Sequence, residues 1–132
     1  MSKPKSILDH QQLQIIINRL CHQLVENHND FSNTVLIGLQ PRGIYLCQRI
    51  KESLESNFPD YNLEVGNLDI TFYRDDFRRR EDPLVANSTS LSVSLEGKKI
   101  VLIDDVLYTG RSVRAALDAL HDYGRPLSVE LM

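Results

Sequence analysis

The run from Lys99 to Val113 constrains the fold of this chain more than any other stretch. Four apolar residues, Ile100 to Ile103, are followed at once by two carboxylates, Asp104 and Asp105. An apolar run of this length is typical of a buried parallel strand. A turn containing Thr109-Gly110 comes next, and an amphipathic helix is predicted behind it. The pattern therefore predicts a strand that delivers two acidic side chains to its carboxyl end, just before a helix.

A glycine-containing, hydroxyl-rich turn before a helix is suited to holding a phosphate. The free N–H groups of the first helical turn and the helix dipole both favour an anion. Thr109 and Ser112 can add hydroxyl donors, and Gly110 can adopt a positive φ. The two carboxylates would repel a phosphate unless a cation or sugar hydroxyls lay between, and a ribose diol with Mg²⁺ meets that need. These residues alone thus indicate a phosphorylated sugar with a metal; the alternative is a polar strand end followed by an ordinary capping turn.

Strand-like and helix-like segments alternate along the rest of the chain. Asp9 is predicted to cap the first helix, with Gln12 as its capping-box partner. Gly124 and Pro126 are predicted to end the last helix. The predicted helices cover residues 9–26, 43–54 and 112–123, and the predicted strands cover residues 34–38, 63–73, 99–104 and 127–132. This alternation predicts a single α/β domain over residues 1–132, with a mostly parallel sheet flanked by helices.

Composition excludes several other classes of protein. The 132 residues are 42% hydrophobic and 25% charged, and the formal net charge of -3 gives no strong electrostatic footprint for nucleic acid. Cys21 and Cys47 are too few and too far apart for a zinc site or a disulfide framework, so we expect both to be buried. No stretch approaches the ~18 apolar residues of a membrane span, so we expect a soluble, cytoplasmic protein. The four histidines have no partner pattern, and we do not expect them to be catalysts.

The residues from Val101 to Val113 resemble the signature with which type I phosphoribosyltransferases bind 5-phosphoribosyl-1-pyrophosphate (PRPP). The surrounding sequence, Asp104 to Leu120 and then Gly124-Arg-Pro126, is similar to the PyrR branch of that family. Members of this branch are pyrimidine-operon RNA attenuators with uracil phosphoribosyltransferase activity. The similarity extends to Gly38–Leu46 and Leu68–Asp76, and so covers nearly the whole chain. The resemblance implies a type I phosphoribosyltransferase fold.

The resemblance also assigns roles to particular residues. Asp104 and Asp105 would be the catalytic residues. They would hold the ribose hydroxyls and Mg²⁺, the metal partly through water and PRPP. The segment after them would hold the 5-phosphate. Purine enzymes of the family commonly carry an acidic residue where this chain has Tyr108, so a pyrimidine base is favoured. The full set of residues implied to bind PRPP is Pro41, Arg42, Gly43, Arg74, Asp104, Asp105, Val106, Leu107, Tyr108, Thr109, Gly110, Arg111 and Ser112.

Two further segments would serve the same site. In the family the turn from Gly38 to Gly43 contacts pyrophosphate, and Arg42 offers several donors to a phosphate oxygen; an ordinary turn with a surface arginine is the alternative. We predict a cis peptide bond between Gln40 and Pro41, as this turn often contains one. The stretch from Arg74 to Leu91 is long for a structureless loop. We predict that about residues 78–90 form a lid that is mobile without ligand, although a plain solvated loop is the alternative.

The activity implied by the resemblance is transfer of the phosphoribosyl group of PRPP to uracil, giving UMP and diphosphate. A first alternative is a regulator that binds a pyrimidine-operon mRNA leader, with weak or no enzyme activity; Arg19 and Arg111 or Arg114 could contribute. A second alternative is a phosphoribosyltransferase for another base. Wide apolar surfaces at Ile15–Ile17 and Ile44–Cys47 predict a homodimer or larger homo-oligomer. Relatives continue beyond the equivalent of Met132 with strands and a hood that holds uracil, so we expect the C-terminal part of the domain to be absent.

Overall fold

The computed structural model describes residues 3–70 and 94–132 of the chain. In that part the order of elements is α1 (His10–His28), β1 (Thr34–Leu39), α2 (Gly43–Asn57), β2 (Glu64–Leu68), β3 (Lys99–Ile103), α3 (Arg111–Leu120), the short 3₁₀ helix η3 (His121–Tyr123) and β4 (Ser128–Leu131). Every predicted helix and strand is present, with ends that differ by a few residues. The predicted strand over residues 63–73 ends as β2 at Leu68, and its last residues, 71–73, lie outside the described part.

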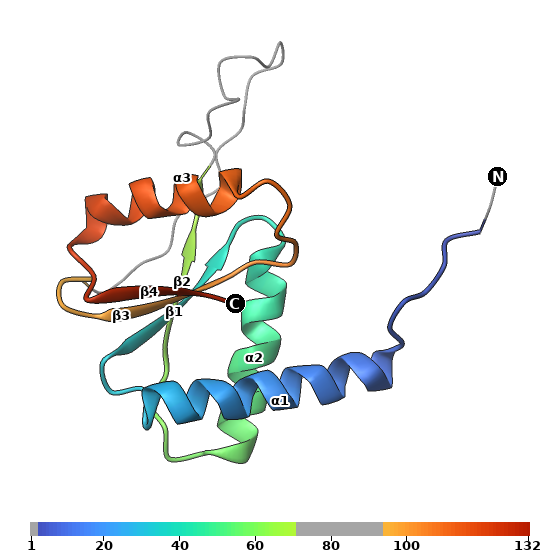
Figure 1. Ribbon diagram of the computed structural model, residues 1–132. Coiled ribbons are helices and arrows are strands. Elements are labelled where there is room, and N and C mark those ends of the chain that lie inside the picture. Colours follow the sequence, from blue (N-terminus) through green and yellow to red (C-terminus); the bar gives the residue numbers. More distant parts are fainter. Residues whose placement is uncertain (1–2, 71–93) are drawn as a thin grey trace, which may run out of the picture.

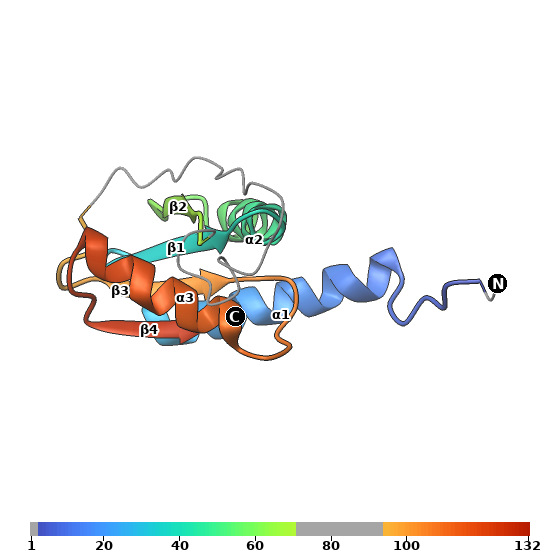
Figure 2. The same cartoon turned by 90° about the horizontal axis from the view of Figure 1, so that it is seen from above.

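Four parallel strands form the sheet in the order β2-β1-β3-β4. Figure 2 shows the strands one beside the next in this order. β1 and β3 are central and pair in register, with Val35 opposite Ile100 and Gly38 opposite Ile103. Their carboxyl ends therefore lie side by side at the same edge of the sheet. The predicted α/β fold with a parallel sheet is confirmed.

Helices cover both faces of this sheet (Figure 1). α3 packs on one face, where Ala116 and Leu120 meet Ile37 and Leu102. α1 and α2 pack on the other face, where Ile17 and Ile50 belong to the same cluster as Leu36, Val101 and Ile103. Alternate residues of β1 and β3 thus serve opposite cores, which explains why these strands are apolar throughout.

The first helix begins as its sequence predicts. The Asp9 carboxylate accepts a hydrogen bond from the Gln12 N–H at 2.7 Å, and the Gln12 side-chain oxygen accepts one from the Asp9 N–H at 2.9 Å. The capping box is therefore confirmed. The N-terminal half of α1 projects past α2 in both views. Ile15 belongs to this half and is 62% exposed.

Both cysteines lie inside the layer formed by α1, α2 and the sheet. Cys21 and Cys47 are buried, as predicted, and neither forms a disulfide. Burial raises the pKa of Cys47 to about 11, which keeps its thiol protonated at neutral pH. These residues fill the core and offer no reactive thiolate.

Two glycines let α2 approach the sheet closely. A Cβ on Gly38 would lie 2.9 Å from the Cα of Ile44, in the first turn of α2. A Cβ on Gly43 would collide with the carbonyl oxygen of Ile103 and lie 3.2 Å from the Cα of Asp104. The start of α2 is thereby held against the end of β3, next to the acidic pair.

No helix among residues 3–70 and 94–132 is long and apolar enough to cross a membrane.

Candidate functional site

The candidate site lies at the carboxyl edge of the sheet, where the loop after β3 meets the turn after β1. In open parallel sheets this edge is where ligands bind. A pocket of about 190 Å³ opens there between Arg42, Asp104 and the loop that leads into α3. Its lining consists of Arg42, Asp104, Val106, Leu107, Tyr108, Thr109, Gly110, Arg111, Ser112 and Val113. Most of the residues implied to bind PRPP are therefore brought together, and Val113 joins them without having been predicted.

The turn after β1 contains the predicted cis peptide bond between Gln40 and Pro41, which is confirmed. The Gln40 N–H donates to the carbonyl of Leu68 at 2.9 Å, so this turn is tied to the end of β2. Arg42 follows immediately and precedes the first residue of α2. The backbone of Arg42 is thus held between the anchored turn and the start of α2. Its side chain is 72% exposed.

The two carboxylates occupy different environments. The Asp105 N–H donates to the Asp104 carboxylate at 2.9 Å. Burial raises the pKa of Asp104, the hydrogen bond from the Asp105 backbone opposes this, and the adjacent Asp105 carboxylate raises it further. The charge of Arg42 acts in the lowering direction. Asp105 itself forms an ion pair with Arg42, whose Nε lies 3.0 Å from Oδ2.

The turn before α3 has a left-handed glycine at its last position. Gly110 is the N-cap residue and adopts φ 82 and ψ 2, a left-handed conformation that favours glycine. The N-cap residue makes no side-chain capping hydrogen bond, so the N–H groups of Ser112 and Val113 keep their capacity for an external acceptor. The Arg111 N–H donates to the Thr109 hydroxyl at 3.3 Å, which holds the turn in shape.

Three consecutive apolar side chains of this loop face solvent. Val106 is 60% exposed, Leu107 67% and Tyr108 92%. Exposed apolar side chains in a row beside polar groups are typical of a binding surface. Tyr108 can thus meet a ligand without any rearrangement of the core.

The described residues offer only part of a coordination shell for a metal. Asp104 and Asp105 are hard oxygen ligands of the kind that Mg²⁺ prefers. Within the described part of the chain, no group of three or more His, Cys, Asp or Glu residues could hold an ion. The donor set therefore fits Mg²⁺ bound largely through water and substrate oxygens, and does not fit an all-protein cage.

Some of the residues implied to bind PRPP do not line this pocket or lie outside the described residues. Arg74 and the predicted lid over residues 78–90 lie outside the described residues. Gly43 does not line the pocket, and its observed role is to seat α2 against β3.

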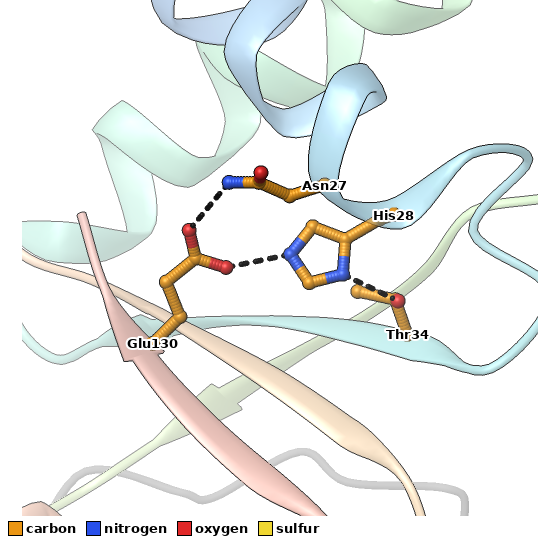
Figure 3. A network of polar contacts seen from close by, with 4 residues as sticks. All are labelled: Asn27, His28, Thr34 and Glu130. Carbon is orange, nitrogen blue, oxygen red and sulfur yellow. Dashed lines mark hydrogen bonds and ion pairs between the residues drawn. The ribbon is translucent and has the colours of Figure 1, made fainter.

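A polar network at the C-terminal end of α1 was not predicted from the sequence (Figure 3). The Nε2 atom of His28 lies 2.6 Å from the Glu130 carboxylate, and its Nδ1 lies 2.9 Å from the Thr34 hydroxyl. Asn27 donates to the other oxygen of Glu130 at 3.2 Å. The network joins the end of α1 to β1 and to the edge strand β4. Both ring nitrogens of His28 thus have partners within the fold.

Comparisons with known proteins identify the family of this chain. The family model described as a phosphoribosyl transferase domain matches residues 4–131. The bifunctional protein PyrR of Halalkalibacterium halodurans is 45% identical over 128 residues, which cover 95% of this chain and 70% of the relative. The PyrR protein of Caldicellulosiruptor bescii is 44% identical over 131 residues, covering 99% of this chain and 71% of the relative.

Solved structures give the same fold. A hypoxanthine phosphoribosyltransferase from Staphylococcus aureus superposes with a TM-score of 0.71 at 17% identity, covering 97% of this chain and 65% of that one. The chain thus spans about two thirds of the length of that enzyme. The fold and the family model define a type I phosphoribosyltransferase domain. Since the curated relatives match over nearly the whole chain, it belongs to the phosphoribosyl transferase domain family and, within that family, to the PyrR group.

Proposed function

We propose that this chain binds PRPP with Mg²⁺ and transfers the phosphoribosyl group to uracil, giving UMP and diphosphate. The observation that carries the proposal is the convergence of Asp104, Arg42 and the uncapped start of α3 on one pocket. Each meets a different part of PRPP. The acidic pair suits the ribose hydroxyls, the start of α3 suits the 5-phosphate, and Arg42 suits the pyrophosphate.

The proposed reaction needs no nucleophilic side chain. A nitrogen of the base displaces pyrophosphate at the anomeric carbon, and the protein contributes by positioning the reactants and stabilising charge. Mg²⁺ held by Asp104 and Asp105, water and PRPP oxygens would neutralise charge on the leaving group. The residues of this chain position the substrate. The N–H groups before and within α3 bind the 5-phosphate, and the carboxylates orient the ribose.

The choice of uracil rests on the similarity to PyrR proteins and on Tyr108. A phenol at this position cannot make the charged contact that an acidic residue makes to a purine ring. The experiment is release of pyrophosphate from PRPP and Mg²⁺ in the presence of uracil, cytosine, hypoxanthine or no base. Release that depends on uracil supports the proposal. Release with hypoxanthine alone would instead favour a purine enzyme, and no release with any base would remove the enzymatic proposal.

A second candidate function is pyrimidine-dependent binding of an mRNA leader, favoured by the 44–45% identity to proteins named bifunctional PyrR. The exposed Arg19 lies on α1, whereas the exposed Arg111 and Arg114 lie on α3, across the sheet. One flat surface cannot include all three, so an RNA hairpin would contact one set or the other. Salt-dependent binding of a labelled hairpin to Arg19→Gln and Arg114→Gln variants distinguishes the two faces.

The proposal extends to the partners and the location of the chain. The partners are PRPP and a pyrimidine base, the subunit self-associates, and the location is cytoplasmic. These expectations rest on the family resemblance and the composition.

A further inference from the structure

The carboxylate of Asp105 already has a cationic partner. Arg42 Nε lies 3.0 Å from its Oδ2, and the two side chains are 72% and 34% exposed, respectively. An ion pair with this much exposure is weak, because water competes for both groups. The arginine can therefore leave the carboxylate at little cost.

This ion pair conflicts with the proposed role of Asp105. A guanidinium at Oδ2 takes up acceptor capacity that a ribose hydroxyl would use, and its charge repels a divalent cation at the same carboxylate. Arg42 also lines the pocket that is bounded by Asp104 and the start of α3. One arginine thus lies within reach of two sites of opposite charge preference, the acidic pair and the place of a bound pyrophosphate.

We propose that Arg42 exchanges its partner when substrate binds. Its side chain moves from the Asp105 carboxylate to the pyrophosphate, and the carboxylate becomes available to Mg²⁺. The inference rests on the proposed PRPP binding and adds a specific step to it. Arg42 acts first as the counter-ion of the acidic pair and then as a pyrophosphate ligand. A cation would stand beside Asp105 both before and after the exchange.

The exchange predicts effects of opposite sign for a single substitution. Replacing Arg42 by Gln removes a positive charge from beside Asp105, so a divalent cation offered alone should bind more tightly, on the order of fivefold. The same substitution removes a charge-assisted contact to pyrophosphate, so PRPP with Mg²⁺ should bind on the order of tenfold more weakly. A purely structural role for Arg42 would weaken both.

The experiment measures both affinities on the full chain. Mn²⁺ alone is titrated and followed by electron paramagnetic resonance, with an Asp105→Asn variant giving the level of binding elsewhere. PRPP with Mg²⁺ is titrated by calorimetry. Arg42→Lys, which keeps a charge, should lie between the wild type and Arg42→Gln in both titrations. Arg125→Gln is the matched control, because this exposed arginine adjoins Glu96 and Gly97 before β3, at the opposite end of the sheet.

The outcomes separate the exchange from the proposed function. Tighter Mn²⁺ and weaker PRPP binding in Arg42→Gln, with neither change in Arg125→Gln, is the expected result. Unchanged or weaker Mn²⁺ binding in Arg42→Gln, while the wild type binds PRPP, overturns the exchange alone, as does unchanged PRPP affinity. A wild-type chain that does not bind PRPP overturns the proposed function and the exchange with it.

Discussion

The carbonyl oxygen of Ile103 lies against the Cα of Gly43, where any side chain would overlap it. The first residue of α2 and the last residue of β3 are thereby packed backbone to backbone. This contact places Arg42, one residue before α2, beside the acidic pair that follows β3. The arrangement of Arg42 and the acidic pair therefore requires glycine at position 43, because a larger residue would overlap the backbone of β3.

Replacing Gly43 by Ala should therefore destabilise the fold and displace the turn that carries Arg42. Backbone atoms must shift to admit the methyl group, and overpacking of this kind costs about 1–3 kcal/mol. Urea unfolding followed by circular dichroism measures the loss, with Ser56→Ala, at an exposed position of α2, as the control. Equal stability of Gly43→Ala and wild type would contradict the close contact.

The edge strand should depend on the network around His28. Replacing Glu130 by Ala leaves the buried Nε2 of His28 without its acceptor at 2.6 Å and detaches β4 from α1. Because the carboxylate is partly exposed, we expect a loss of about 1–2 kcal/mol in the free energy of unfolding. Glu130→Gln, which retains an oxygen acceptor, should lose less. Glu26→Ala, at an exposed position of α1, should stay within about 0.5 kcal/mol of wild type. If Glu130→Ala behaves like Glu26→Ala, the network does not stabilise β4.

Asp104 should lower stability at neutral pH. Burial and the adjacent Asp105 carboxylate raise its pKa, so the folded chain holds a proton that the unfolded chain releases more readily. The stability of wild type therefore falls as the pH rises from the ordinary aspartate range through the raised value. Asp104→Asn lacks this loss, so it should be more stable than wild type at pH 7, by a margin that shrinks near pH 4. Urea midpoints at the two values measure this, and a margin that grows as pH falls would contradict it.

The subunit should self-associate through its exposed apolar side chains. Ile15 is 62% exposed on the projecting half of α1, and Tyr45 is 70% exposed at the start of α2. We predict that these side chains contribute to an interface, which a two-fold dimer would use twice. Light scattering at micromolar concentration should give a mass above the 15.1 kDa monomer. The Ile15→Glu variant should shift toward the monomer, whereas a folded wild type of monomer mass would contradict the prediction.

The fold could be predicted from the sequence because local signals agree with it. The capping box at Asp9, the apolar strands at Thr34 and Lys99 and the stop at Gly124 are all short-range patterns. Their alternation leaves few arrangements other than a parallel sheet. The least accurate boundary was the end of β2: apolar and β-branched residues continue past Leu68, but the strand does not extend to them within the described residues.

The site was predictable only in part. The acidic pair and the turn before α3 are contiguous in sequence, so a local pattern is enough to single out both. The ion pair between Arg42 and Asp105 joins residues far apart in the chain, and no local pattern indicates it. It follows from the adjacency of β1 and β3, which is a property of the assembled sheet. The same holds for His28 and Glu130, whose pairing depends on β4 lying at the edge beside β3.

The most direct test of the account is a calorimetric titration of PRPP with Mg²⁺ into wild type and into an Asp104→Asn, Asp105→Asn double variant. The substitutions keep the size of both side chains and remove their charges, so the fold should be retained, as circular dichroism can verify. The account predicts that wild type binds PRPP and that the folded double variant does not. Equal affinity of the two proteins for PRPP would contradict it.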